Sequence, residues 1–269
     1  MKRRILSLVL CLVVLDVCLA YADDPAPQTP KETRELFNGH SLEGWYTFIK
    51  DRGVNDDPKG VFTVTDGMIH ITGEEFGCIT TEEAFCDYRI IVEYKWGEKR
   101  WPPRQSCTRD SGLLVHSVGA DGAFGGTWLY SIEANIIEGG VGDFIVVGDG
   151  SDQFSITVET APEQSPQGQF IWQQGGKAET INQGRVDWFA RDPKWSDTAD
   201  FRGQNDVDLP HGQWNTLEVV AEGDTLDVFV NGTLVNQASK VRPSSGRIQI
   251  QSEAAEIFIR RITLAPLSK

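Results

Sequence analysis

Apolar and polar residues alternate along most of this chain after about residue 34. The clearest example is the segment 88–96, in which every second residue is apolar and most of the residues between them are charged. The apolar positions are Tyr88, Ile90, Val92, Tyr94 and Trp96. A period of two is typical of a strand that buries one face in a core, so this pattern predicts a β-strand.

Short turns separate other segments of the same kind. The segments 217–221 and 226–230 also alternate, and the turn signals that follow them are Glu222-Gly223-Asp224 and Asn231-Gly232. Two more strands are predicted over 247–251 and 256–264, and no segment of the mature chain has a helical period over three turns. Many short strands with glycine-rich turns predict an all-β fold, an antiparallel sandwich or jelly roll in one domain.

The segment 161–212 interrupts the alternation. It carries large aromatic residues among Gly, Gln, Asp and Arg, and is predicted to be a long loop region. Loops of this length in a compact domain are commonly lids or binding loops. Trp188 is therefore a candidate for stacking on a sugar ring, with anchoring of the loop to the domain as the alternative.

The first residues predict a signal for export. A basic start, Met1-Lys2-Arg3-Arg4, precedes a mostly apolar run over 5–17 and the small-x-small sequence Ala20-Tyr21-Ala22. This order predicts a signal peptide over 1–22, and hence export to a periplasm or to the medium. The apolar run is too short to span a bilayer. The proline-rich residues 23–33 are predicted to be a flexible leader, which leaves 34–267 as the domain.

The composition limits the classes of partner. The net charge is −14, and removal of residues 1–22 leaves 22 basic and 38 acidic residues, a net charge of −16. This charge would repel nucleic acid and anionic membranes and favours a neutral substrate. The predicted mature chain has three cysteines, of which Cys78 and Cys86 lie near enough in sequence to form a disulfide, and no Cys or His spacing indicates zinc.

Carboxylates interrupt the otherwise apolar strand predicted over 128–137. Glu133 and Asn135 should share one face of this strand, and Glu138 can join them only if a bulge supplies an extra residue. Burying carboxylates is costly unless they are paired, hydrogen-bonded or used in chemistry. This acidic row is therefore a candidate floor of an active site, and a sheet face open to solvent is the alternative.

An ordered set of short motifs resembles one known family. The motifs are Leu36-Phe37-Asn38-Gly39-His40-Ser41-Leu42-Glu43-Gly44-Trp45, Val64-x-Asp66-Gly67-x-Ile69, Asp110-Ser111-Gly112-Leu113, the Glu133 strand, Gly212-Gln213-Trp214-Asn215, Val230-Asn231-Gly232 and Ile248-Gln249-Ile250-Gln251-Ser252-Glu253. Over about residues 34–267 the chain resembles the 3-keto-disaccharide hydrolase domain family. This resemblance implies a concanavalin A-like jelly-roll sandwich of two antiparallel sheets, in an exported enzyme acting on glycosides oxidised at C3.

The chemistry that the resemblance implies needs a base, an acid and a stabiliser of negative charge. A carbonyl at C3 acidifies the C2 proton, so a base can remove it and the substituent at C1 can leave as an acid protonates its oxygen. Water can then add to the enone, which completes a net hydrolysis. The enolate needs hydrogen-bond donors or a bound cation. A divalent cation therefore stays open as a cofactor, although no loop has an EF-hand pattern.

Three residues are predicted to be catalytic. Glu133 is the expected base, because its neighbours Tyr130, Ile132 and Ile136 should keep it dry and raise its pKa, although a structural carboxylate is the alternative. Glu138 is the second acid/base or cation ligand. His116 could shuttle a proton near neutral pH, or be an ordinary core or surface histidine.

Other polar residues are predicted to bind the glycoside or oligosaccharide substrate. They are Asp110, Asn135, Arg202, Asn205, Gln251 and Glu253, together with Trp188. Asp110 stands where the family often has Asn, and either binds a sugar hydroxyl or caps a turn. Arg202 is able to stabilise an enolate, with a surface ion pair as the alternative, and for Glu253 the alternative is an ordinary turn residue.

Two other functions stay open. The sequence Glu-x-Asn-x-x-Glu over 133–138 resembles the Glu-x-Asp-x-x-Glu catalytic strand of laminarinase-like endoglucanases, which use two carboxylates on a jelly roll. Asn135 stands in place of the central Asp and weakens that interpretation. The other alternative is a carbohydrate-binding module without catalysis, because a fold does not determine a function.

Overall fold

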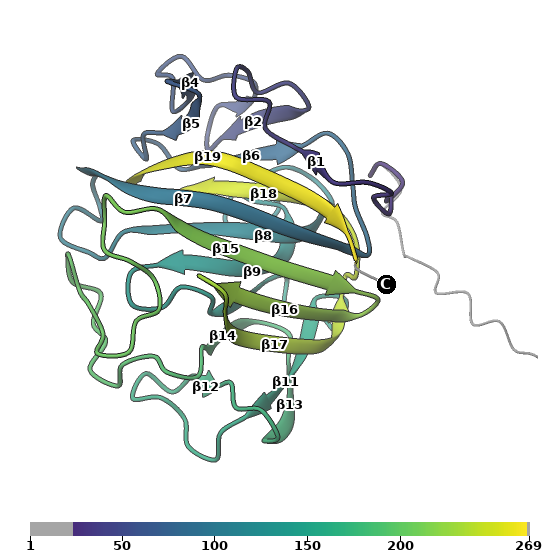
Figure 1. Cartoon of the computed structure of the whole chain (residues 1–269), viewed down its shortest axis with the longest axis vertical. Coiled ribbons are helices and arrows are strands. Elements are labelled where there is room, and N and C mark those ends of the chain that lie inside the picture. The colour runs from purple at the N-terminus through teal and green to yellow at the C-terminus, as the bar shows by residue number, and fades with distance from the viewer. Residues whose placement is uncertain (1–23, 268–269) are drawn as a thin grey trace, which may run out of the picture.

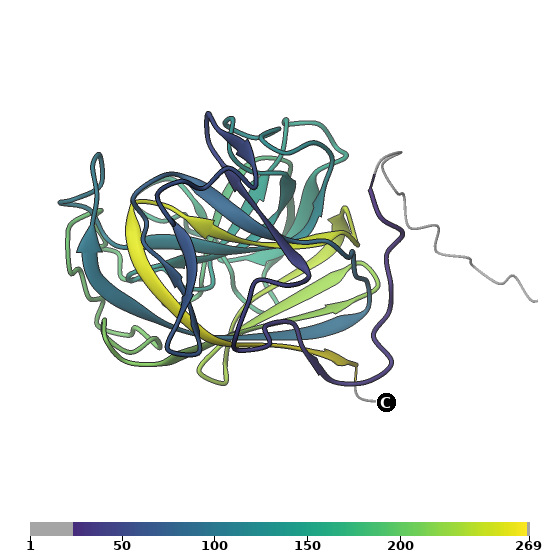
Figure 2. The same ribbon diagram turned by 90° about the horizontal axis from the view of Figure 1, so that it is seen from above.

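Two large β-sheets stack face to face in the computed structural model, which describes residues 24–267. Figure 1 shows one sheet in front, with β18, β8 and β9 of the other sheet behind it, and the view from above in Figure 2 shows the two layers. The described residues contain no helix. In that range, therefore, no helix is present that could cross a membrane. The all-β, jelly-roll-like class predicted from the sequence is confirmed.

The ten-stranded sheet forms the front layer in Figure 1. Its order is β13 (Lys177–Ile181), β11 (Ser155–Thr160), β17 (Thr233–Arg242), β16 (Thr225–Val230), β15 (Asn215–Glu222), β7 (Tyr88–Arg100), β19 (Ala255–Pro266), β5 (Met68–Ile71) and β4 (Phe62–Thr65), with β1 (Arg34–Glu35) beside β19.

The nine-stranded sheet forms the second layer and carries the polar residues discussed below. Its order is β12 (Phe170–Ile171), β14 (Gly184–Asp187), β10 (Phe144–Val147), β9 (Tyr130–Ile137), β8 (Asp110–Val118), β18 (Arg247–Ser252), β6 (Gly77–Thr81), β2 (Trp45–Ile49) and β3 (Gly53–Val54). Neighbouring strands are antiparallel except β12 and β14.

The alternation in the sequence determines which face of each strand enters the core. The five apolar residues predicted on one face of the 88–96 segment are all buried in the core between the sheets. From the other sheet, Leu113 and Val115 of β8 and Ile132 and Ile136 of β9 pack into the same core. Each buried aliphatic or aromatic side chain contributes about 1.5–3 kcal/mol relative to an exposed one, so this interface stabilises the stacking.

The predicted hairpin turn at Asn231-Gly232 is confirmed. It joins β16 to β17, with φ values of 49° at Asn231 and 80° at Gly232. Two consecutive positive φ angles are what a type I′ turn requires, and Asn followed by Gly adopts them at little cost.

The segment 161–212 differs from the long loop predicted for it. It contains β12, β13 and β14, which extend both sheets, and its longest strand-free part begins at residue 188 and continues to residue 214. The three strands are short and two of them are mostly polar, so hydrophobic alternation does not reveal them. The strand-free part packs on the turn after β9, where Trp195 donates a hydrogen bond to the carbonyl of Glu138 at 2.9 Å.

Residues 24–33 contact the domain rather than forming the predicted flexible leader. The Asp24 carboxylate accepts hydrogen bonds from the Gly119 amide at 2.8 Å and from Arg247 at 2.5 Å. The Gln28 amide donates to the Ala84 carbonyl at 2.9 Å. The predicted signal peptide over residues 1–22 lies outside the described residues.

The disulfide considered from the sequence is not formed. Cys78 and Cys86 are not joined to each other. Cys78 is buried on β6, where its Sγ lies 3.1 Å from Nε2 of Gln249, while Sγ of Cys86 lies 3.3 Å from Oγ1 of Thr29. The two thiols therefore have separate surroundings.

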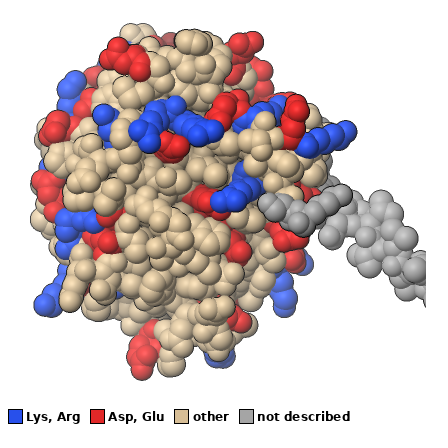
Figure 3. Space-filling view, in the orientation of Figure 1, with Lys and Arg blue, Asp and Glu red and all other residues tan. Residues whose placement is uncertain are grey.

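The outer face of the ten-stranded sheet carries charges of both signs. Figure 3 shows basic and acidic side chains interleaved in a band over β19 and β7. Arg260 pairs with Glu93 at 2.6 Å, and Arg89 pairs with Glu218 at 2.8 Å. Exposed pairs of this kind contribute about 0–1 kcal/mol each, so they favour solubility more than stability.

Candidate active site

Polar side chains line the face of the nine-stranded sheet that points away from the core. Strand register brings them together: Glu133 of β9 lies opposite Leu114 of β8, and Asn135 lies opposite Gly112. Across the other edge of β8, Leu114 pairs with Gln249 of β18. Glu133 is only 3% exposed and Asn135 only 1% exposed. This face is therefore polar and yet largely closed to water.

Loops cover this polar face. The amide of Leu129 donates to Oε1 of Gln249 at 3.2 Å, which places the segment before β9 over β18. At the other end, Arg104 from the segment between β7 and β8 lies 3.1 Å from the Asp110 carboxylate. The side chain of Arg104 keeps 20% of its surface exposed, so the cover is thinnest beside it.

Asn135 lies at the centre of a hydrogen-bonded network. Its Nδ2 lies 2.7 Å from Oε1 of Glu133 and 3.0 Å from Oδ1 of Asp110, and donates to these carboxyl groups. Its Oδ1 accepts a hydrogen bond from Nη1 of Arg185 at 3.0 Å. Asn135 and Glu133 thus share one face, as the sequence predicts, and the amide holds two acidic groups near each other.

Burial, followed by the nearby charge of Asp110, raises the pKa of Glu133 to about 8. The sequence predicts this direction but assigns it to the wrong neighbours. Ile132 and Ile136 point into the core, and the residues beside Glu133 on its own face are Leu114 and Ile145. Residues one or three positions apart on a strand point to opposite faces of the sheet, so Glu133 faces away from Ile132 and Ile136.

Glu253 and Asp110 add two more carboxyl groups to the cluster. Glu253 follows β18 and forms an isolated bridge with Asp110. Burial, together with the charges of Asp110 and Glu133, raises the pKa of Glu253 well above its usual range. Burial also raises the pKa of Asp110, although the guanidinium of Arg104 opposes this. Raised pKa values favour the protonated form of a carboxyl group, so such a cluster is suited to donate and accept a proton.

Gly112 provides the space in which two polar side chains meet. A Cβ atom at this position would lie less than 3.0 Å from Oε1 of Glu133 and from Oε1 of Gln251. Gln251 donates through Nε2 to Glu133 at 3.4 Å, while its own Oε1 is buried with no hydrogen-bond partner. An unsatisfied buried acceptor costs about 1–3 kcal/mol, so this atom is suited to accept a hydrogen bond from a ligand.

Two arginines border the cluster and were not predicted from the sequence. Arg104 pairs with Asp110, and Arg185 donates to both Asn135 and Asp143. Arg104 lies in an irregular segment and Arg185 on the four-residue strand β14, so neither has a local pattern that would reveal its position. Both guanidinium groups can stabilise negative charge that develops beside the carboxyl groups.

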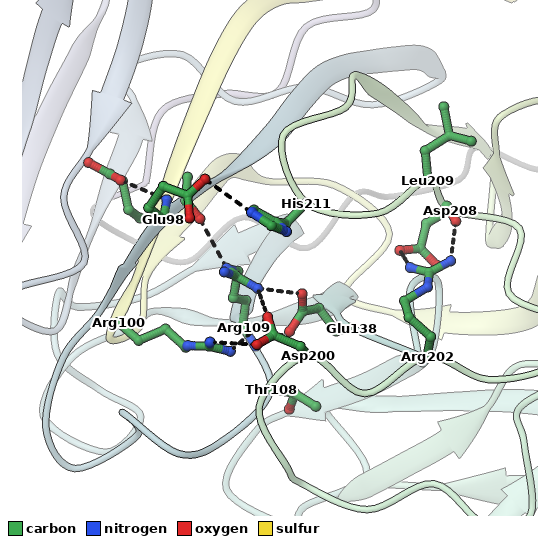
Figure 4. Close-up of polar contacts among 12 residues, drawn as sticks. Glu98, Arg100, Thr108, Arg109, Glu138, Asp200, Arg202, Asp208, Leu209 and His211 are labelled. Atoms are coloured by element: carbon green, nitrogen blue, oxygen red, sulfur yellow. Dashed lines mark hydrogen bonds and ion pairs between the residues drawn. The ribbon is translucent and has the colours of Figure 1, made fainter.

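Glu138 does not join the polar row, and the predicted catalytic role is not supported by its position. Figure 4 shows the carboxylates of Glu138 and Asp200 next to each other, both accepting from Nη1 of Arg109. Oε1 of Glu138 lies 2.8 Å from Nη1 of Arg109, and Oε2 accepts from the Arg109 amide at 2.9 Å. Strand β9 ends at Ile137 without a bulge there, so Glu138 is left to neutralise a buried arginine.

His116 also lies away from the cluster. A bulge in β8 between Val115 and Val118 gives His116 a φ of 55° and turns its ring towards the core. The ring contacts Tyr88 edge-on, with centroids 5.8 Å apart, and Nδ1 lies 3.0 Å from the Pro243 carbonyl. Burial lowers the pKa of His116 to about 4. We therefore do not assign His116 a role in proton transfer.

The predicted substrate-binding residues of the long segment are held elsewhere. Arg202 pairs with Asp208 at 2.6 Å, and Figure 4 shows this pair apart from Arg109 and Glu138. Trp188 is 2% exposed and its indole donates to the Gly139 carbonyl at 3.5 Å, so it anchors the segment and cannot stack on a sugar. Asn205 lies in the exposed part of the same segment.

No group of three or more His, Cys, Asp or Glu side chains within residues 24–267 is arranged to hold a metal ion. Asp110, Glu133 and Glu253 approach one another, but they interact with amides and guanidinium groups. We assign no metal to the cluster.

Comparison with known proteins supports one family. Residues 32–265 match the model of the 3-keto-alpha-glucoside-1,2-lyase-like domain, and no curated protein matches the chain. A solved structure from Parabacteroides distasonis ATCC 8503, described as a candidate glycosyl hydrolase, has 16% identity and a TM-score of 0.50, and covers 88% of this chain and 94% of that chain. A second structure from the same organism, with the same description, has 16% identity and a TM-score of 0.48 over 88% of this chain and 100% of that chain. At this identity the first structure shows a shared fold.

The raised pKa of Glu133 predicts a pH-dependent gain in stability for Glu133→Gln. The folded protein binds more protons than the unfolded chain between the ordinary pKa of Glu and about 8, so ionisation of Glu133 destabilises the wild type as the pH rises through this range. Gln cannot ionise. We expect the variant to gain up to about 4 kcal/mol relative to wild type between pH 5 and pH 8.

Urea unfolding at both pH values measures this difference. Glu222→Gln, at the exposed end of β15, is the matched control and should change little. An equal effect of Glu133→Gln at pH 5 and pH 8 would contradict the raised pKa.

The position of Glu138 predicts a structural role. Glu138→Ala leaves the buried Arg109 guanidinium with only the more exposed Asp200 as a charged partner. The expected loss of stability is about 3–5 kcal/mol in urea unfolding. Asp200→Asn, whose side chain is 59% exposed, should cost no more than about 1 kcal/mol. A Glu138→Ala protein of unchanged stability that has lost turnover would instead indicate a catalytic role.

Proposed function

This chain belongs to the family of 3-keto-alpha-glucoside-1,2-lyase-like domains, and on that premise we propose that it is an enzyme that cleaves 3-keto-glycosides by elimination and hydration. The observation that carries the proposal is the cluster of Glu133, Glu253 and Asp110, in which three carboxyl groups with raised pKa values lie beside two guanidinium groups. This combination provides the base, the acid and the positive charge that the reaction needs.

In the first half of the proposed reaction, ionised Glu133 removes the proton from C2. The electron pair of the broken C2–H bond forms the enolate with the C3 carbonyl, and its return expels the oxygen at C1. Glu253, whose pKa is raised well above its usual range by burial and by the charges of Asp110 and Glu133, donates a proton to the departing oxygen. The products are an enone and the free aglycone, and Glu253 is left as a carboxylate.

In the second half, water adds to C1 of the enone and gives one proton to the Glu253 carboxylate, which restores the acid. C2 takes back a proton from the now protonated Glu133, and the product is the hydrated 3-keto sugar. The sum of the two halves is a hydrolysis in which Glu133 first accepts and then returns one proton. The guanidinium groups of Arg104 and Arg185 stabilise the enolate oxygen in both halves.

The exposure of the side chains indicates the direction from which the sugar approaches. Glu133 is closed to water, whereas Glu253, Arg104 and Arg185 are partly exposed. In this proposal the sugar therefore approaches the cluster beside these three residues. The unpartnered Oε1 of Gln251 accepts a hydroxyl of the sugar in this arrangement.

The geometry weighs against the laminarinase-like alternative. That mechanism needs Glu133 and Glu138 on both sides of one glycosidic bond, about 5–5.5 Å apart. Glu138 is turned towards Arg109 and Glu133 towards Asn135. A carbohydrate-binding module without catalysis remains the second candidate, because the same polar face could hold a sugar without reacting.

Export is part of the proposal. The basic start, the apolar run over 5–17 and Ala20-Tyr21-Ala22 support cleavage after residue 22. N-terminal sequencing of the protein recovered from the periplasm or medium of a bacterial host should begin near Asp23, and an uncleaved cytoplasmic product would contradict export.

Purified protein should release the aglycone from 3-keto-glucosides and not from the unoxidised parents. Glu133→Gln should lower turnover about 10²–10⁴-fold with every aglycone, because no other group removes the C2 proton. Glu253→Gln should lower turnover strongly for a substrate with an alkyl aglycone. It should lower turnover only slightly for a substrate with 4-nitrophenol, whose oxygen leaves without protonation. Glu222→Gln serves as the control.

Absence of turnover in the intact protein, with glycan binding retained, would favour the binding module. Cleavage of an unoxidised β-glucan would favour the endoglucanase. Each assay is run with and without a chelator, so that a cation requirement is seen directly.

The pH dependence of kcat/KM gives a second test. The base must be ionised in the free enzyme, and the pKa of Glu133 is raised to about 8. We expect kcat/KM to rise nearly tenfold per pH unit below this value and to level off above it. A plateau that begins near pH 5 would show that another group is the base.

A further inference from the structure

A groove lies on the ten-stranded sheet, on the other sheet from the acidic cluster. Its volume is about 470 Å³, within the range of small-molecule sites. Three strands, β11, β17 and β16, supply most of its lining, and the segment after β12 supplies the rest. The lining residues are Thr157, Glu159, Trp172, Gln174, Thr225, Asp227, Gln237, Ala238 and Ser239.

The polar side chains of the groove are held in place before any ligand binds. Nε2 of Gln237 donates to Oδ1 of Asp227 at 2.9 Å, across neighbouring strands. Oε2 of Glu159 accepts from the amide of Gly175 at 2.6 Å. In these two hydrogen bonds each carboxylate uses one oxygen, which leaves the other oxygen to accept a hydrogen bond. Fixed side chains lose little conformational entropy on binding, so such an arrangement favours affinity.

An aromatic side chain forms part of the wall. Trp172 is 6% exposed and packs in the hydrophobic core, so its position is fixed. Phe189 contacts it edge-on, with ring centroids 6.1 Å apart, and is 46% exposed. Trp172 is the aromatic residue of the groove lining, and Phe189 packs against it from outside that lining.

The lining identifies the class of ligand. No Lys or Arg is present among the lining residues, and two are acidic, so phosphates and other anions are disfavoured. Hydroxyl, amide and carboxylate groups next to an aromatic wall suit a neutral ligand that presents many hydroxyl groups and an apolar face. We propose that this groove is a second glycan-binding site, which takes a neutral oligosaccharide and is separate from the acidic cluster.

Affinity electrophoresis of the full mature chain tests the proposal. The gels contain laminarin, hydroxyethyl cellulose, soluble starch, dextran or xylan, with alginate as the anionic comparison. We expect at least one neutral glycan to retard the wild type and alginate to have no effect. Asp227→Asn and Gln237→Ala should each weaken that retardation about tenfold, which corresponds to the loss of one hydrogen bond to a charged group.

Two controls separate this site from the catalytic proposal. Asp66→Asn makes the same charge change in the exposed turn between β4 and β5, at the opposite end of the sheet, and should retain binding. Glu133→Gln should also retain it, while the groove variants should retain release of 4-nitrophenol from its 3-keto-glucoside. The proposal is overturned if no neutral glycan retards the wild type, or if Glu133→Gln removes the retardation and the groove variants do not.

Discussion

The shielding of three carboxyl groups from water, nearly complete at Glu133 and Asp110 and partial at Glu253, is the constraint on which the candidate site depends. Glu133, Asp110 and Glu253 lie on a sheet face that would ordinarily be solvated, but loops cover it and the pKa values of all three rise. The cost of this arrangement is limited by Asn135, which donates to two of the three, and by Arg104 and Arg185 at the margin. A carboxyl group kept partly protonated at neutral pH is a typical device of acid–base catalysis.

A second buried ionisable residue, Arg109, is stabilised by neighbours of opposite charge. Arg109 is as deeply buried as Glu133, yet Glu138, Asp200 and the Gly97 carbonyl accept its hydrogen bonds. This arginine connects the end of β7, the start of β8 and the segment after β14, and so fixes the rim of the polar face. Two acidic residues of one sequence motif, Glu133 and Glu138, thus have different surroundings: one is surrounded by other acids and the other neutralises a cation.

The alternation of apolar and polar residues made the fold predictable, and with it the shared face of Glu133 and Asn135. On a regular strand successive side chains point to opposite faces, so the face of each residue follows from its position in the sequence. This rule fails where the strand is irregular. A bulge turned His116 into the core, and the end of β9 at Ile137 left Glu138 beyond the row. Arg104, Arg185 and the role of Gly112 depend on segments far apart in the chain that meet only in the folded protein. A local sequence pattern does not indicate contacts between such distant segments.

The position of β19 has a consequence for biosynthesis. This strand, near the end of the described chain, lies between β5 and β7 and beside β1, all from the first half of the sequence. The early strands therefore leave the ribosome well before their central neighbour exists, and their open edges must be kept from pairing with other chains in the meantime. A nascent chain of this protein is a natural client for a holding chaperone until its last strand has been synthesised.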